Sequence, residues 1–442
     1  MSGRTASWER ALDAARPERS GTVKAVLGLG AEVIGIDAAV GDRVRIQVAD
    51  GRRVDAEIVA VDGASARCMP LAPLDGITAR AKVLHTGSGL RVPTGPALLG
   101  RVLDGLGRPI DGKGPLDRGA EFVALDNDAP SILHRQRIAT QLGLGVRVLD
   151  TMTPVGTGQR LGLFAGSGVG KSSLMSMIAR GSSADVTVIA LVGERGREVR
   201  EFIEDDLGPE GLARSVVVVA TSDQPAMVRM RSAFVATRIA ERFREDGANV
   251  MLMMDSLTRV AMAQREIGLS AGEPPATRGY PPSTFSVLAR LLERAGTGPV
   301  GSITGLYTVL VDGDDHNEPI ADAARGILDG HVVLDRALAV RGHFPAVDVL
   351  GSISRVVSKI TSSEQRASAV ALRSVLAARR GANDLIDIGA YRAGANPLVD
   401  AALAHEAAIS GFLTQGMEDL AGADDSWRRL AALTTEFGGL TP

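Results

Sequence analysis

The sequence predicts a multidomain α/β protein with a small N-terminal β-barrel, a central domain built on a largely parallel sheet, and a C-terminal helical domain. Three observations support this prediction. Turn signals follow one another closely up to about residue 90, apolar strands alternate with helices from 91 to 350, and helical periodicity alone continues from 351 to 442. The 442 residues suffice for about three domains at roughly 150 residues each.

Residues 1–20 contain a short amphipathic stripe before Pro17. Its apolar side chains recur at i, i+3, i+4 and i+7: Trp8, Ala11, Leu12 and Ala15. The stripe either packs on the barrel or serves as a docking segment for a partner. These residues contain four Arg, two Glu and one Asp and no apolar stretch of signal-peptide length, so we expect no secretory signal. No apolar run of the sequence approaches the roughly 18 residues of a membrane span. We expect a cytoplasmic protein, and the lone Cys68 fits a reducing compartment.

Residues 21–90 are expected to form the barrel. The clearest signal is a hairpin in which Asp50 and Gly51 form the turn between two alternating segments. The apolar positions of those segments are Val44, Ile46, Val48, Val54, Ala56 and Ile58. No aromatic residue occurs between Trp8 and Phe122, so the barrel lacks the side chains on which nucleic-acid bases stack. The 49 Lys and Arg residues against 52 Asp and Glu residues give a net charge of −3, and we expect no nucleic-acid partner.

Residues 91–350 are expected to form the central domain. Continuous apolar runs at 186–192, 215–220, 250–254 and 306–311 are typical of strands buried on both faces of a parallel sheet. A helix is expected between them from Pro225 to about Asp246.

Residues 351–442 are expected to be helical. One helix carries Val370, Leu372, Val375 and Leu376, and we expect it to end at Gly381. Another begins at Asn396 as N-cap with Pro397 in its first turn, and its apolar spacing continues to Leu413.

The strongest chemical signal is a glycine-rich turn between the apolar strand that starts at Leu161 and a helix that ends at Gly181. Such a turn wraps backbone N–H groups around an oligophosphate, while the helix N-terminus adds partial positive charge. The expected nucleotide-binding residues are Gly166, Ser167, Gly168, Val169, Gly170, Lys171, Ser172 and Ser173. Lys171 would reach the β and γ phosphates, and the Ser172 hydroxyl would ligate Mg²⁺. One departure from the usual pattern is Ala165, which stands where glycine is common.

Two further strands end in carboxylates. Asp255 follows the apolar run 250–254 and is a candidate for the Mg²⁺ hydration shell. Glu194 follows 186–192 and either orients the attacking water or belongs to the charge cluster of a helix start, together with Arg195. Phe344 could stack on adenine or fill the core, and Arg355 could contact phosphate or pair with an acid. The residues alone leave these alternatives open.

Several segments resemble the catalytic subunits of rotary ATP synthases and their relatives. They are Ala165 to Ser173, Gly193 to Arg195, Asp255 to Arg259, and Pro345 to Arg355. Within that superfamily, other segments are similar to the type III export ATPases, with the flagellar export ATPase as the nearest type and the injectisome ATPase as a close neighbour. These are 104–114, 272–285, 318–322, 327–331 and 388–391.

The resemblance implies a RecA-like ATPase that forms a homohexameric ring, binds ATP and Mg²⁺, and places a nucleotide at each subunit interface. It implies that Glu194 activates water, that Arg195 lies near the γ phosphate, and that Lys171 and Ser172 hold phosphate and Mg²⁺. Asp255 would support the metal shell. Phe344 would line the adenine pocket, where Tyr is common in the rotary enzymes, and Arg355 would be the finger that reaches into a neighbour's site.

The resemblance also implies partners: a stalk-like regulator that binds the N-terminal segment, a central coiled-coil stalk subunit, export chaperones with cargo, and the membrane export gate. Peripheral association with the inner-membrane export apparatus follows from these. Three competing functions are a non-catalytic ring subunit, an RNA-translocating helicase, and the catalytic subunit of a proton-translocating synthase. Glu194 argues against the first of these, and the aromatic-free barrel and net charge argue against the second.

Overall fold

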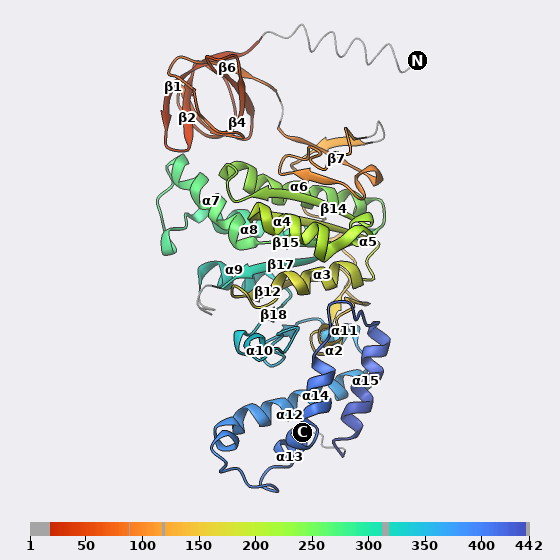
Figure 1. Cartoon of the computed structure of the whole chain (residues 1–442). Helices are drawn as coiled ribbons and strands as arrows, with labels where there is room; N and C mark the ends of the chain where they lie inside the picture. Colours follow the sequence, from red (N-terminus) through yellow and green to blue (C-terminus); the bar gives the residue numbers. More distant parts are fainter. Residues whose placement is uncertain (1–17, 88, 117–119, 312–317, 439–442) are drawn as a thin grey trace, which may run out of the picture.

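The computed structural model describes residues 18–87, 89–116, 120–311 and 318–438. The stripe from Trp8 to Ala15 lies outside these residues. Figure 1 shows the barrel at one end of the molecule, the central sheet with its helices in the middle, and the C-terminal helices at the other end. The predicted fold class is confirmed. None of the helices in the described ranges combines the length and the apolar character needed to cross a membrane.

The barrel consists of six strands that close in the order β1-β2-β5-β4-β3-β6. Their bounds are β1 Ser20–Leu27, β2 Gly30–Ile34, β3 Arg43–Gln47, β4 Arg53–Asp62, β5 Ser65–Pro70 and β6 Lys82–His85. The predicted hairpin is β3 and β4, in which Val44 pairs with Ala56 and Ile46 with Val54. These four side chains are buried in the interior of the barrel. Alternation along both strands therefore specifies the register, because a one-residue slip would turn the apolar side chains outward.

A buried ion pair joins the barrel to the central domain. Glu57 of β4 accepts hydrogen bonds from the Nε (2.9 Å) and Nη2 atoms of Arg231 in helix α6 (Ala226–Glu245), and both residues are buried. A second contact runs from Arg67 of β5 to the carbonyl oxygen of Ser270 (3.4 Å). Because an unpaired buried charge is costly, the Glu57–Arg231 pair fixes where the barrel sits on the domain.

The central sheet has nine strands, ordered β19-β18-β12-β17-β15-β13-β14-β8, with β16 paired to β17. All pairs are parallel except β16–β17 and β18–β19. The bounds are β8 Val102–Asp104, β12 Arg160–Ala165, β13 Val186–Glu194, β14 Ser215–Thr221, β15 Asn249–Asp255, β16 Gly296–Thr297, β17 Ser302–Leu310, β18 Gly330–Val333 and β19 Ile353–Ser354. The four apolar runs identified in the sequence are thus β13, β14, β15 and β17.

Short elements lead into and out of this sheet. Strand β7 (Arg91–Thr94) pairs with β9 (Glu121–Ala124), and β10 (Gln141–Leu142) pairs with β11 (Val155–Gly156). Three single helical turns are η1 Pro96–Leu98, η2 Ile132–His134 and η4 Thr277–Gly279.

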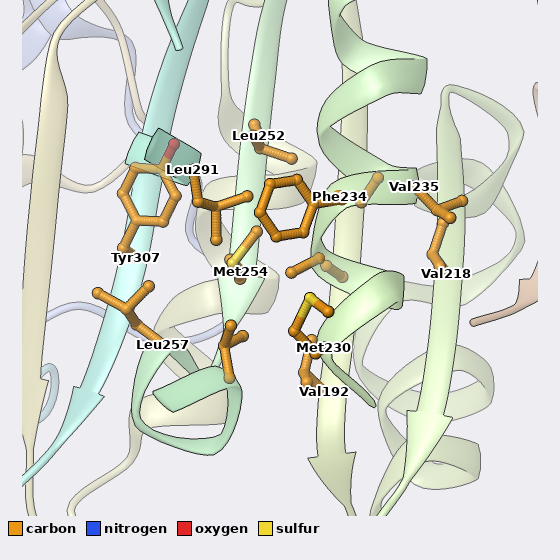
Figure 2. Packing of buried hydrophobic residues seen from close by; sticks show 14 of the residues in the cluster. Val192, Val218, Met230, Phe234, Val235, Leu252, Met254, Leu257, Leu291 and Tyr307 are labelled. Atoms are coloured by element: carbon orange, nitrogen blue, oxygen red, sulfur yellow. The ribbon is translucent and has the colours of Figure 1, made fainter. Parts of the chain in front are cut away.

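Helices cover both faces of the sheet. Their bounds are α2 Arg147–Met152, α3 Lys171–Gly181, α4 Gly196–Glu201, η3 Phe202–Leu207, α5 Gly208–Ala213, α6 Ala226–Glu245, α7 Leu257–Ala271, α8 Pro282–Glu293, α9 Pro319–Ile327, α10 Arg336–Val340 and α11 Val357–Ile360. Phe234 of α6 packs against the face of the sheet that presents Leu252 and Met254 (Figure 2). The other face, which includes Met253, packs with α3 and the C-terminal helices. Burial on both faces explains why the strands are apolar throughout.

The C-terminal helices are α12 Ser363–Asp387, α13 Pro397–Ala404, α14 Glu406–Leu413 and α15 Ala423–Thr435. The Asn396 side chain caps α13 by accepting from the Leu398 N–H (3.0 Å), as predicted. The apolar spacing from there to Leu413 belongs to two helices, because α13 ends at Ala404 and α14 begins at Glu406. The expected end at Gly381 is wrong. A glycine within a helix costs only about 1 kcal/mol, and α12 continues to Asp387 with Ala382 buried.

A buried carboxyl group lies where the C-terminal helices meet the central domain. Asp150 of α2 is completely buried, and its Oδ1 accepts from the Leu144 N–H (2.7 Å). Its Oδ2 is buried without a hydrogen-bond partner among the described residues. Gln141, whose side chain donates to the Asp150 carbonyl oxygen, accepts from the indole N–H of Trp427 in α15 (3.0 Å). Burial raises the pKa of Asp150 to about 7.

We expect the Asp150→Asn variant to lose part of the pH dependence of stability. The unfolded chain releases this proton near pH 4, whereas the folded chain holds it up to about pH 7. The group's contribution to stability is therefore fully present below about pH 4 and is lost as the pH rises through 7. Urea unfolding at pH 5, 6, 7 and 8 measures this loss, which should be on the order of a few kcal/mol in the parent chain. The control is Asp37→Asn, since the Asp37 side chain is 96% exposed. Equal pH slopes for parent and Asp150→Asn would contradict the assignment.

Candidate active site

The predicted phosphate loop joins β12 to α3 at the carboxyl edge of the parallel sheet. Gly168 and Gly170 adopt positive φ angles of 76° and 87°. No side-chain cap occupies the start of α3, where Gly170 is the N-cap residue. A Cβ atom added to Gly168 would meet nothing within 4 Å, so the loop opens onto free space. The unbonded N–H groups of the first helical turn can therefore receive an anion.

The departure at Ala165 has a structural explanation. Ala165 is the last residue of β12 and pairs in parallel with Leu310 of β17. Its methyl group is buried, and its carbonyl oxygen accepts from the Val311 N–H (3.1 Å). Because this position is part of a strand rather than of the turn, it needs no glycine.

The structure brings Lys171 together with both carboxylates predicted from the strand ends. The Lys171 Nζ atom lies 2.5 Å from Asp255 Oδ1 and 3.8 Å from Glu194 Oε1. The hydroxyl of Thr308 on β17 donates to the same Asp255 oxygen (2.6 Å). Thr308 is a site residue that is not predicted from the sequence. In the sequence, Thr308 is only a hydroxyl residue within an apolar strand. Its contact with Asp255 depends on the pairing of β17 with β15 in the sheet.

Glu194 is the last residue of β13, which has an irregular register between Val192 and Glu194. Gly193 has a φ of 72°, and a Cβ atom there would lie 3.0 Å from the Cβ of Arg259. Glu194 Oε1 is buried without a hydrogen-bond partner among the described residues. Burial, followed by the negative charge of Asp255, raises the pKa of Glu194 above its usual value. A carboxylate with a raised pKa is a stronger base, which suits proton abstraction from water.

Arg195 is placed differently. Its side chain is 78% exposed, and its guanidinium pairs with Glu198 (2.8 Å) on the surface of α4. The pairs Arg197–Glu201 and Arg200–Glu204 continue this pattern. Arg195 therefore belongs to the charge cluster at the start of a helix, which is one of the two interpretations of this segment. Glu194 instead points toward Lys171.

Phe344 lies beside the phosphate loop. A Cβ atom added to Gly170 would be 3.3 Å from two of its ring carbons, and the Phe344 side chain is partly exposed. Its carbonyl oxygen accepts from the Gln415 N–H (2.9 Å). A hollow of about 500 Å³ adjoins the ring and is lined by Arg147, Gly342, Phe344, Gly411, Thr414, Gln415, Gly416, Asp419 and Arg429. The residues from 411 to 419 are not predicted from the sequence, because only folding brings the end of α14 and the segment after it to this place.

Arg355 lies near the amino-terminal ends of the parallel strands, at the opposite edge of the sheet from Lys171, which follows their carboxyl ends. The backbone N–H of Arg355 donates to the carbonyl oxygen of Asp329 (3.0 Å). The N–H of Asp329 in turn donates to the carbonyl oxygen of Arg160, the first residue of β12. The phosphate loop follows the last residue of β12, roughly 16 Å away at about 3.3 Å per residue. The exposed Arg355 guanidinium donates to the Arg325 carbonyl oxygen (3.2 Å). The structure thus places Arg355 away from the loop of its own chain.

Comparisons with known proteins agree with this geometry. Residues 145–354 match the ATP synthase alpha/beta family, nucleotide-binding domain, and residues 361–432 match the T3SS EscN ATPase C-terminal domain. The chain is 52% identical to the flagellum-specific ATP synthase of Bacillus subtilis, over 94% of this chain and 95% of that protein. It is 47% identical to the type 3 secretion system ATPase of Xanthomonas euvesicatoria, over 95% of each chain.

A solved structure is similar along nearly the whole chain. The assembled ATPase EscN of enteropathogenic E. coli, in complex with its central stalk EscO, has a TM-score of 0.86 and 41% identity, covering 94% of this chain and 100% of that chain. The nucleotide-binding domain and the named relatives together show an ATPase. The chain belongs to the family of flagellum-specific ATP synthases and type 3 secretion system ATPases.

Proposed function

We propose that this ATPase works as a hexameric ring, hydrolyses Mg-ATP at sites shared between neighbouring copies, and energises protein export through the flagellar type III secretion apparatus. One observation supports the shared site above all others. Lys171, Glu194 and Asp255 meet at one edge of the sheet, while Arg355 lies at the opposite edge. A complete site then needs Arg355 from a second copy.

The residues at the loop fit a nucleotide with Mg²⁺. The loop opens onto free space at Gly168, the first turn of α3 has unbonded N–H groups, and Glu194 has a buried oxygen without a partner. Ser172 and Asp255 would hold Mg²⁺, and the backbone from Gly166 to Gly170 would surround the phosphates. When bound, Mg²⁺ offsets the negative charge that develops on the phosphoryl oxygens.

The remaining steps belong to the side chains of the protein. The Lys171 ammonium forms an ion pair with Asp255 in this structure. On nucleotide binding it would leave Asp255 and contact the phosphates instead. Glu194 would hold the attacking water through its unbonded oxygen and accept a proton from it. Phe344 and the hollow beside it would hold the adenine base, because an aromatic face and an adjoining polar wall suit a planar, hydrogen-bonding ring.

We expect the Lys171→Ala variant to bind ATP at least about tenfold more weakly, because the ammonium contacts phosphate already in the ground state. Titration with a fluorescent ATP analogue measures the affinity, and Lys24→Ala on the barrel surface is the matched control. An unchanged affinity would remove the loop from its proposed role.

The same variant tests the export function in cells. Replacing the chromosomal gene with the Lys171→Ala allele should abolish the appearance of flagellar proteins outside the cell, while the variant chain accumulates normally. If injectisome cargo disappears instead, the chain serves virulence secretion, the alternative favoured by its 47% identity to a secretion ATPase. Unchanged export of both cargo classes would overturn the proposed function.

The proposal includes several partners. The solved complex of EscN with EscO supports a central stalk for this chain too, at 41% identity. A stalk-like regulator would bind the segment 1–20. Export chaperones with their cargo and the membrane export gate would meet the ring at the inner membrane, to which the chain would attach peripherally.

A further inference from the structure

Two adjacent aliphatic side chains project from the central domain. Ile132 and Leu133 form the turn η2 and are 88% and 91% exposed. They are the most exposed large hydrophobic residues in the described part of the chain. Single exposed aliphatic residues are common, but two consecutive ones at this exposure indicate a contact with another surface.

The turn is held firmly in place. The guanidinium of Arg135 donates to the carbonyl oxygens of Pro130 (3.2 Å), Ala295 (3.0 Å) and Glu293 (2.6 Å). The Gln136 side chain donates to the carbonyl oxygen of Pro299 (2.8 Å). Because these bonds anchor the segment to the body of the domain, the two aliphatic side chains are presented in a fixed position. A pre-organised contact loses less entropy on association.

The turn shares a face with Arg355. A Cβ atom added to Gly156 would touch both Ile138 and Val356 (2.3 and 3.4 Å), so the segment after the turn packs beside the loop that follows Arg355. Residues 135–139 and Lys359 line one hollow of about 550 Å³. The face that presents Arg355 therefore continues to Ile132 and Leu133.

The charges of the two edges are complementary. Besides Arg355, this face carries Arg135, Arg137, Arg160 and Lys359 against the carboxylates of Glu293 and Asp329, so positive charge is in excess. On the phosphate-loop side, α4, η3 and α5 span 196–213 and follow directly after Glu194. The stretch 195–210 has three arginines against six carboxylates, namely Glu198, Glu201, Glu204, Asp205, Asp206 and Glu210. A basic face on one copy thus fits the acidic face of a second copy.

We propose that Ile132 and Leu133 form the apolar anchor by which the Arg355 face of one copy seats on the phosphate-loop face of a second copy of this chain. The proposal rests on the shared site of the proposed function. It adds a specific contact, made by Ile132 and Leu133, that positions the two copies so that Arg355 of one can reach the nucleotide site of the other.

The test is the double variant Ile132→Asp/Leu133→Asp in the full chain. Specific ATPase activity is measured against protein concentration, and particle mass is measured by light scattering with ATP present. The concentration for half-maximal specific activity should rise at least about tenfold, since two charges replace two aliphatic groups that the neighbouring copy would bury. The activity at saturating protein should approach that of the parent chain, because neither residue touches the nucleotide site. Unfolding temperature should stay unchanged, as both side chains are exposed.

Ile388→Asp is the matched control, since Ile388 is 75% exposed on the helical domain. It should leave the concentration dependence unchanged. If the double variant assembles and hydrolyses ATP like the parent chain, the anchor is wrong while the shared site stands. If light scattering shows that the parent chain hydrolyses ATP at full rate as a monomer, the shared site fails and the anchor fails with it.

A crosslink identifies the occupant directly. Cys68 is the only cysteine and is buried, so Leu133→Cys introduces a single accessible thiol for a photo-crosslinker. With ATP, illumination should yield a product of twice the chain mass, and peptide mapping should place the second attachment in residues 195–213. A product of unchanged mass would mean that a segment of the same chain covers the turn, and it would overturn the proposal. A dimeric product attached elsewhere would also overturn it.

Discussion

Glu194→Gln is expected to bind Mg-ATP with nearly the parent affinity and to hydrolyse it orders of magnitude more slowly. The carboxylate is largely buried, and its Oε1 lies 3.8 Å from the Lys171 ammonium without a hydrogen-bond partner among the described residues. The amide keeps the size and the hydrogen bonding of this group but cannot accept a proton from water. A general base contributes typically about 10²- to 10⁴-fold to the rate.

The matched control is Glu198→Gln. Glu198 lies one turn further along on the surface of α4 and pairs with the exposed Arg195. A surface pair of this kind contributes little, so the control should hydrolyse ATP normally. Nucleotide affinity and single-turnover hydrolysis are measured for both variants. If Glu194→Gln loses nucleotide affinity in proportion to its rate, the carboxylate has a structural role instead.

The pH profile offers a second readout for Glu194. Burial and the charge of Asp255 raise its pKa, so the water-orienting carboxylate is lost as the pH falls through that raised value. When kcat/KM for ATP hydrolysis is measured against pH, its fall on the acid side should therefore lie at higher pH than the pKa of an ordinary glutamate would give. The Glu194→Gln variant should lack this fall.

The phosphate loop could be predicted because its chemistry depends on consecutive residues. Backbone N–H groups, two glycines with positive φ, and the lysine that starts α3 all lie within one short segment. The carboxylates of Glu194 and Asp255 could be predicted for a related reason. Both end buried parallel strands, and the carboxyl ends of such strands share one edge of the sheet.

The polar surroundings of these residues could not be predicted. Thr308 contacts Asp255 only because β17 and β15 are neighbours in the sheet. Gln415 reaches the Phe344 carbonyl oxygen only because α14 and α15 fold back on the central domain. Neither contact leaves a periodic pattern in the sequence. The wrong helix end at Gly381 has the same origin, since packing of a long helix outweighs a local propensity of about 1 kcal/mol.

Arg355→Ala is expected to bind ATP and to be nearly inactive. Arg355 is level with the first residue of β12, whereas the phosphate loop follows the last, so in the proposed shared site its guanidinium serves an adjacent copy. There it would neutralise charge that develops on the γ phosphate in the transition state. An arginine that acts in this way is worth about 10³- to 10⁵-fold in rate. Arg392→Ala, an exposed arginine on the helical domain, is the control.

Mixing Arg355→Ala with Glu194→Gln separates the shared site from a role within one chain. An interface that combines an intact Glu194 from one copy with an intact Arg355 from its neighbour is complete, even though each chain alone is inactive. The mixture should therefore hydrolyse ATP well above the sum of the two variants, with the gain greatest near equal proportions. Subunit exchange is verified first by energy transfer between labelled chains. If exchange occurs and activity stays at the level of the separate variants, Arg355 acts within its own chain or only structurally, and the shared-site mechanism is wrong.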